Sequence, residues 1–166
     1  MISVIATDPE IPSIAAMIEQ LDGYQLSLYP EESNHLVSIE ELTAENVYFV
    51  AAYEGPDLIG CGAIKYVDCA CCDKDIGGYG EIKRVFVKTE ARGKGVSKEI
   101  MAKLESNARY RKVEVIRLET GIHQPEAIGL YARLGYRRRG PFGEYPDDPV
   151  SVFMERRLLP EPECQE

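Results

Sequence analysis

Residues 85–97 read VFVKTEARGKGVS, and this segment joins the end of an apolar strand to the start of a helix through a glycine-rich turn. The first N–H groups of a helix lack partners within the helix and carry the positive end of its dipole, so they favour an anion. Gly93 and Gly95 have no Cβ and let phosphate oxygens approach the backbone. Positive charge is added by Arg92, Lys94 and Lys98. The segment predicts a phosphate-binding turn, and a merely solvated helix start is the alternative.

Two common nucleotide fingerprints do not fit this turn. A P-loop needs a glycine five residues before its Gly-Lys pair, and Lys88 stands there. A dinucleotide fingerprint needs a third glycine three residues after Gly95, where the chain has Lys98. The spacing therefore favours a different phosphate-containing ligand.

Two motifs resemble those of the GNAT superfamily of N-acetyltransferases. The pattern Arg92-x-x-Gly95-x-Ser97 is similar to the superfamily's pyrophosphate motif R/Q-x-x-G-x-G/A, with serine as the last small residue. Residues from Gln124 to Tyr136 resemble its N-x-x-A-x-x-L-Y-x-x-x-G-F/Y helix, with glutamine in place of asparagine. A predicted strand, 113–119, separates the motifs, and the resemblance covers residues 45–158. The resemblance is to the bacterial members of the superfamily that act on small molecules.

The apolar periodicities predict a mixed α+β fold. Helices are expected after Asp8-Pro9, ending near Gly23, at 38–42, after Lys94, and from Pro125 to Gly135. Strands are expected at 1–7, 47–53, 58–67, 79–87, 113–119, from 136, and 150–156. This order mixes an antiparallel meander with one strand–helix–strand crossover. The resemblance implies a GNAT fold with a mostly antiparallel sheet of about six to seven strands and about four flanking helices. Residues 1–159 should form one domain, followed by a flexible tail, 160–166.

Composition narrows the classes of partner. The chain has 166 residues, a net charge of -9 and a mean hydropathy of -0.24. Such a charge disfavours nucleic acid and is compatible with cationic amines, although solubility alone also explains it. No apolar run approaches the roughly 20 residues that span a bilayer, and the start lacks a signal peptide. We therefore expect a cytoplasmic protein without a membrane partner, and the resemblance permits a homodimer.

The cysteines do not suggest a disulfide framework or a metal site. Their number is odd, five, and three of them cluster at Cys69, Cys71 and Cys72. A zinc site would need a second Cys pair or paired histidines, and the chain has only His35 and His123. We predict no metal and a polar loop with oxidisable thiols at 69–72.

The resemblance implies three catalytic groups. Glu81, on the strand before the glycine turn, would be the base that deprotonates the amine. Its alternative role is a surface glutamate paired with Lys83 or Arg84. A backbone N–H at the strand's bulge, at Val87 or its neighbour, would stabilise the oxyanion. Tyr131 would stabilise or protonate the departing thiolate, and a packed aromatic is its alternative role.

The resemblance also implies two binding regions. Acetyl-CoA would be the acetyl donor, held by Phe86, Val87, Arg92, Gly93, Lys94, Gly95, Val96, Ser97 and Gln124. The acceptor would contact Tyr29, Ser33, His35, Arg84, Phe142 and Tyr145. A substrate carboxylate on Arg84 would favour amino-acid-like amines, and a cofactor-side or surface cation is the alternative for this residue.

The predicted function is N-acetyl transfer from acetyl-CoA to the primary amine of a small molecule such as an amino acid or polyamine. Two alternatives remain from the sequence. One is a protein acetyltransferase acting on an N-terminus or lysine, and the other is a non-catalytic acetyl-CoA-binding module. The residues do not identify the amine or restrict the acyl group to acetyl.

Overall fold

A computed structural model describes residues 1–68 and 78–158 of the chain. The predicted thiol loop at Cys69–Cys72 and the predicted tail, 160–166, lie outside these residues.

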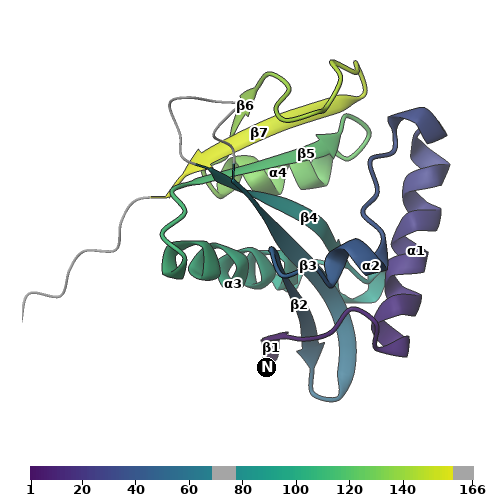
Figure 1. Cartoon of the computed structure of the whole chain (residues 1–166). Coiled ribbons are helices and arrows are strands. Elements are labelled where there is room, and N and C mark those ends of the chain that lie inside the picture. Colours follow the sequence, from purple (N-terminus) through teal and green to yellow (C-terminus); the bar gives the residue numbers. More distant parts are fainter. Residues whose placement is uncertain (69–77, 159–166) are drawn as a thin grey trace, which may run out of the picture.

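The described residues form one seven-stranded sheet with the spatial order β1-β2-β3-β4-β5-β7-β6 (Figure 1). The strands are β1 (Ile2–Ala6), β2 (Val47–Glu54), β3 (Asp57–Val67), β4 (Tyr79–Val87), β5 (Val115–Gly121), β6 (Arg137–Arg139) and β7 (Ser151–Arg157). Every neighbouring pair is antiparallel except β4 and β5, which run parallel. The mixed, mostly antiparallel sheet that the sequence predicted is confirmed.

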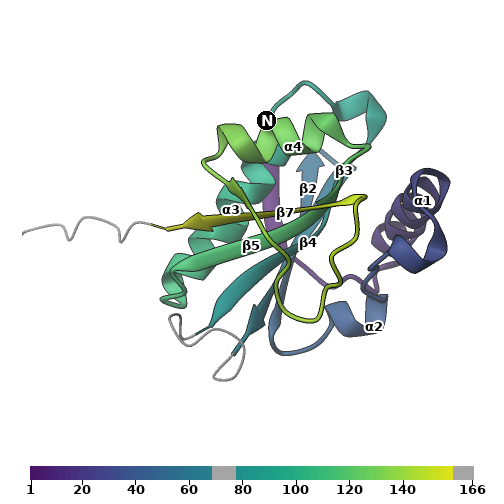
Figure 2. The ribbon, with the colours of Figure 1, turned by 90° about the horizontal axis from the view of Figure 1, so that it is seen from above.

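Helices cover both faces of this sheet (Figures 1 and 2). Those on one face are α1 (Pro12–Leu28) and α2 (Ile39–Leu42), and those on the other are α3 (Val96–Tyr110) and α4 (Pro125–Arg133). The apolar positions of α3 recur every three to four residues and bury Ile100, Met101 and Leu104 against the sheet. A 3₁₀ turn, Glu31–Ser33, follows α1, and a second one, Thr89–Ala91, precedes the glycine turn.

The predicted bounds of the first helix were wrong at both ends. Asp8 does not cap it, because the Asp8 carboxylate accepts a hydrogen bond from the backbone N–H of Glu10 in a turn before the helix. The helix begins at Pro12 and continues past the exposed Gly23 to Leu28. Packing of the α1 residues against the sheet outweighs the roughly 1 kcal/mol that an interior glycine costs a helix. This extra length brings the end of α1 to the site described below.

A β-bulge in β4 changes which face its side chains occupy. Cys61 lies opposite Phe86 and Ala63 opposite Lys83, so β4 carries one residue more than β3 between these pairs. Arg84 adopts a left-handed conformation there, with φ of +57°. After the bulge Phe86 packs on the α1 side and Val87 on the α3 side. The bulge lies at Arg84 and Val85, and not at Val87 or its neighbour as predicted.

The parallel pairing of β4 with β5 is short. It joins Gly80–Ile82 to Ile116–Leu118, although β4 continues to Val87 and β5 to Gly121. The two strands therefore diverge toward their carboxyl ends, beside the N-termini of α3 and α4 (Figure 1). The cavities of the candidate site lie at this divergence.

Candidate active site

The glycine turn has the conformation that its sequence requires. Gly93 and Gly95 have φ angles of +81° and +79°, and Gly95 is the N-cap of α3. A Cβ at either residue would point into open space, so these conformations, rather than close packing, account for the glycines. The backbone of the turn is thereby left accessible at the positive end of a helix of 15 residues.

A cleft of about 530 Å³ begins at this turn and extends along α4. Its cations are Arg92, Lys98 and Arg133, against one acid, Glu126. The cleft includes every residue predicted to bind acetyl-CoA except Lys94: Phe86, Val87, Arg92, Gly93, Gly95, Val96, Ser97 and Gln124. Lys94 instead forms an exposed ion pair of 2.9 Å with Glu54. A cationic cleft with an accessible helix N-terminus fits a diphosphate-containing ligand such as acetyl-CoA.

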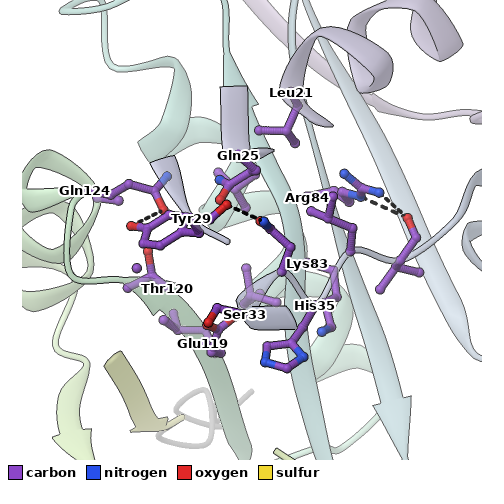
Figure 3. A pocket seen from close by; sticks show the side chains of 18 of the residues that line it. Leu21, Gln25, Tyr29, Ser33, His35, Lys83, Arg84, Glu119, Thr120 and Gln124 are labelled. Atoms are coloured by element: carbon purple, nitrogen blue, oxygen red, sulfur yellow. Dashed lines mark hydrogen bonds between the residues drawn. The ribbon is translucent and has the colours of Figure 1, made fainter. Parts of the chain in front are cut away.

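A second, smaller cavity of about 120 Å³ lies between the end of α1 and strands β4 and β5 (Figure 3). We call it the acceptor pocket. Its polar lining includes Tyr29, Ser33, His35, Lys83, Arg84, Glu119, Thr120 and Gln124. Five residues line both the pocket and the cleft: Leu21, Val85, Gln124, Ala127 and Tyr131. The two cavities therefore share a boundary, as group transfer between two ligands requires.

Four of the six residues predicted to contact the acceptor line this pocket: Tyr29, Ser33, His35 and Arg84. Phe142 does not, because it is buried in an aromatic cluster with Tyr79 and Phe153. Tyr145 is also absent from the lining and stacks edge-on against His35, with ring centroids 5.1 Å apart. Tyr145 thus contacts the pocket residue His35 from outside the cavity, and Phe142 packs against Tyr145.

The end of α1 is fixed in the pocket by hydrogen bonds. Tyr29 is buried, and its hydroxyl accepts from the backbone N–H of His123 at 3.1 Å and donates to Gln124 at 3.3 Å. Burial raises the pKa of Tyr29, so the hydroxyl stays protonated. Ser33 donates to the carboxylate of Asp148 at 2.6 Å, which joins the segment after α1 to the turn before β7.

Arg84 is a buried residue, so the alternative of a surface cation is wrong. Its guanidinium forms an ion pair with Asp22 of α1 and donates to the carbonyl of Val37. These contacts join the bulge of β4 to α1 and to the segment before α2. A role in binding a substrate carboxylate stays a prediction, and these partners would compete with it.

Glu81 is buried, with 6% of its surface exposed, so it is not a surface glutamate, although the pairing with Lys83 that belonged to this alternative is present. Its carboxylate forms an ion pair of 2.9 Å with Lys83 and accepts a hydrogen bond from the Tyr145 hydroxyl. Lys83 also donates to the Tyr145 hydroxyl. Glu81 does not line the acceptor pocket. Its role as the base stays a prediction.

Sequence analysis missed a second carboxylate, that of Glu119 on β5, which does line the pocket. Burial raises its pKa from the ordinary 4.5 to about 7, with Glu81 and Asp148 acting in the same direction. Lys83 and the neighbouring Ser151 lower it. The alternation Arg117, Glu119, Gly121 along one strand could have shown that Glu119 shares a face with polar residues.

Tyr131 lies in α4 on the boundary between the cleft and the pocket, with 7% of its surface exposed. Its ring packs edge-on against Tyr136, with centroids 5.8 Å apart. The hydroxyl makes no hydrogen bond with residues 1–68 or 78–158, and burial raises its pKa. The hydroxyl is therefore a protonated group positioned between the two cavities.

A mixed sheet that opens beside a glycine turn and a helix N-terminus, with a diphosphate-compatible cleft, fits the class of acyl-CoA-dependent transferases. Residues 14–136 match the family model of the acetyltransferase (GNAT) family, and the chain belongs to this family. It is an acetyl-CoA-dependent N-acetyltransferase, and members of this family act on small molecules or proteins.

Two relatives extend the similarity over nearly the whole chain. An IAA acetyltransferase of Azospirillum brasilense is 38% identical, and the alignment covers 95% of this chain and 98% of the relative. A Klebsiella pneumoniae protein, provisionally assigned as an acyl-CoA N-acyltransferase, is 34% identical in its crystal structure, with a TM-score of 0.75 and coverage of 96% and 99%.

A more distant structure shares the fold. The PaiA N-acetyltransferase of Thermoplasma acidophilum, crystallised with coenzyme A, is 18% identical, with a TM-score of 0.70 over 95% of this chain and 99% of that one. In the described part of the present chain, no helix combines the length and the apolar character needed to cross a membrane.

Proposed function

We propose that this chain transfers the acetyl group of acetyl-CoA to the primary amine of a small molecule, such as an amino acid or a polyamine. The acceptor pocket is the observation that carries this proposal. Its volume of about 120 Å³ and its closure by α1 and the following 3₁₀ turn suit a small acceptor better than a peptide. The described carboxylates at or near it, Glu81, Glu119 and Asp148, favour a cationic ammonium group.

The chain's residues have distinct tasks in this proposal. The glycine turn and the cations Arg92, Lys98 and Arg133 bind the phosphates of acetyl-CoA. A backbone N–H of β4, at Val87 or its neighbour, stabilises the oxyanion that forms when the amine attacks the thioester carbonyl. This part of β4 lies beyond the residues paired with β5.

Tyr131 protonates the departing thiolate. Its raised pKa keeps the hydroxyl protonated until the C–S bond breaks. The amine nitrogen gives up one proton before it attacks and one as the C–N bond forms. One of these protons ends on the thiol and the other reaches solvent, so the products are an amide, free coenzyme A and one proton.

The test combines binding with turnover. Calorimetric titration with acetyl-CoA should show binding at one site, and thiol release should then be screened with amino acids, polyamines, IAA and a lysine-containing peptide. Release with a small amine supports the proposal. Release with the peptide alone makes the chain a protein acetyltransferase, and binding without release from any acceptor overturns the proposed function.

A further inference from the structure

Two glutamates from neighbouring strands lie on the same face of the sheet, and both interact with the ammonium group of Lys83. Glu81 lies opposite Arg117 in the β4–β5 pairing, and Glu119 follows Arg117 by two residues, so the pleat directs both carboxylates to the acceptor side. Lys83 pairs with Glu81 and also lowers the pKa of Glu119. One ammonium group therefore serves two carboxylates.

The two carboxylates differ in their partners. One oxygen of Glu81 already has two donors, the Lys83 ammonium and the Tyr145 hydroxyl, and its side chain is 8% exposed. This oxygen is therefore already engaged by two donors from the protein itself. Because Glu81 also lies outside the pocket lining, it has no direct access to an amine in that cavity.

Glu119 has the opposite properties. It lines the pocket together with Ser33 and Thr120 (Figure 3), and Tyr131 lines both this pocket and the cleft. Among the described residues it takes part in no ion pair within 4.0 Å, and the neighbouring Ser151 hydroxyl acts on it as a hydrogen-bond donor that lowers its pKa. No described cation holds its carboxylate within ion-pair distance, so the carboxylate can accept a proton from a ligand.

Charged and titratable groups from every neighbouring element act on Glu119. They are Tyr29 at the end of α1, Glu81 and Lys83 on β4, and Tyr145 and Asp148 in the turn before β7. His35, in the segment before α2, lines the same pocket. Burial and the two acids together outweigh the Ser151 hydrogen bond and Lys83, so the pKa of about 7 lies where a base is effective at neutral pH.

We propose that Glu119 is the catalytic base that accepts the proton of the acceptor amine, and that Glu81 is a positioning residue that holds Lys83 and Tyr145. This inference rests on the proposed acetyl transfer. The N–H bond of the ammonium breaks, an O–H bond forms on Glu119, and the freed lone pair attacks the thioester carbon. Glu119 then returns its proton to solvent, which restores the carboxylate for the next cycle.

The test compares Glu119→Gln with Glu81→Gln, and uses Glu114→Gln, an exposed acid just before β5, as the matched control. For each protein the dependence of kcat on pH is measured at saturating acetyl-CoA and amine, together with acetyl-CoA affinity and thermal unfolding. In the wild type we expect kcat to rise with pH through about 7. Glu119→Gln should lower kcat at pH 7 by about 100-fold or more and abolish this rise, with unchanged acetyl-CoA affinity.

Glu81→Gln should keep the rise and move it to lower pH, because removal of a neighbouring negative charge lowers the pKa of Glu119. Glu114→Gln should resemble the wild type throughout. The inference is overturned if a folded Glu119→Gln variant keeps the wild-type profile, or if Glu81→Gln alone abolishes it. A wild-type protein that acetylates no amine removes the proposed function as well, which separates that failure from a misassigned base.

Discussion

The hydroxyl of Tyr29 lies directly over Gly121, so closely that a Cβ on Gly121 would be 1.7 Å from the hydroxyl oxygen. Tyr29 ends α1 and Gly121 ends β5, so this contact fixes the helix to the strand that carries Glu119. Only a residue without a side chain allows this approach.

Gly121→Ala should therefore displace Tyr29 and open the acceptor pocket. We expect the KM for the amine to rise by about tenfold or more and the free energy of unfolding to fall by about 1–3 kcal/mol, as overpacking usually costs. Acetyl-CoA affinity should change little. Steady-state kinetics and urea unfolding measure the three quantities.

The control for that variant is Gly23→Ala in the same helix, α1. A Cβ at Gly23 would meet nothing within 4 Å, so the change should raise the free energy of unfolding by about 1 kcal/mol through helix propensity. The kinetics should not change. A wild-type KM for the amine in Gly121→Ala would show that the pocket does not depend on the Tyr29 contact.

The glycine turn can be tested with Gly95→Val. A branched side chain at φ of +79° should destabilise the protein by about 1–2 kcal/mol or more and place bulk where the diphosphate should lie. We expect at least a tenfold weaker Kd for acetyl-CoA, measured by calorimetry.

Gly55→Val separates these two effects. Gly55 lies in the β2–β3 hairpin with φ of +59°, and a Cβ added there, as at Gly95, would meet no atom within 4 Å. The variant should lose comparable stability while keeping its acetyl-CoA affinity. Equal affinities in the two variants would refute the placement of the diphosphate.

Tyr131→Phe tests the proton donor. Because the hydroxyl has no described protein partner, its removal should leave stability within about 0.5 kcal/mol of the wild type. We expect kcat to fall by about 10–100-fold with acetyl-CoA affinity unchanged. Unchanged kcat would remove Tyr131 from the mechanism and leave it as a packed aromatic.

Tyr136→Phe is the complementary control. The Tyr136 hydroxyl donates to buried Glu105 at 3.0 Å, and Arg156 also pairs with this carboxylate at 2.8 Å. Its loss should lower the free energy of unfolding by about 1–3 kcal/mol, the cost of a hydrogen bond to a buried charge. Catalysis by the folded fraction should be retained.

Glu119 also predicts how stability depends on pH. Its pKa is raised in the folded protein, from the ordinary 4.5 to about 7, so its contribution to stability is fully present below pH 4.5. Between these values the unfolded chain has released the proton and the folded protein has not, so stability falls as pH rises.

Glu119→Gln should remove this part of the pH dependence and be more stable than the wild type at pH 8. Urea unfolding of both proteins at pH 5 and pH 8 measures the difference, which isolates Glu119 from the other titrating groups. A variant less stable than the wild type at pH 8 would contradict the raised pKa.

Local patterns predicted most of the architecture, because strands such as Tyr79–Val87 and the Ser38 cap of α2 depend on nearby residues alone. The family and its acetyl-CoA cleft were predicted from two short motifs for the same reason. The bulge at Arg84 was misplaced because it depends on the register with β3, which no local pattern records.

The acceptor pocket was harder to predict, since it depends on contacts between distant segments. Tyr145 lies 64 residues from Glu81 in sequence, yet its hydroxyl donates a hydrogen bond to the Glu81 carboxylate, which was expected to accept a proton from the amine. Glu119 was overlooked because its character comes from burial between elements and not from a motif. The ion pair of Lys94 was not foreseen for a similar reason, as its partner Glu54 lies 40 residues away on β2.

The extra residue in β4 makes the length of this segment as constrained as its composition. Deleting one residue between Lys83 and Phe86 would turn every later side chain of the strand over, placing Phe86 toward α3 and Val87 toward α1. The glycine turn would then follow a strand whose last side chains point to the wrong faces of the sheet. Homologous chains are therefore expected to vary in sequence at this point while keeping the same number of residues, so a gap in an alignment here would mark a protein whose acetyl-CoA site has been lost or rebuilt.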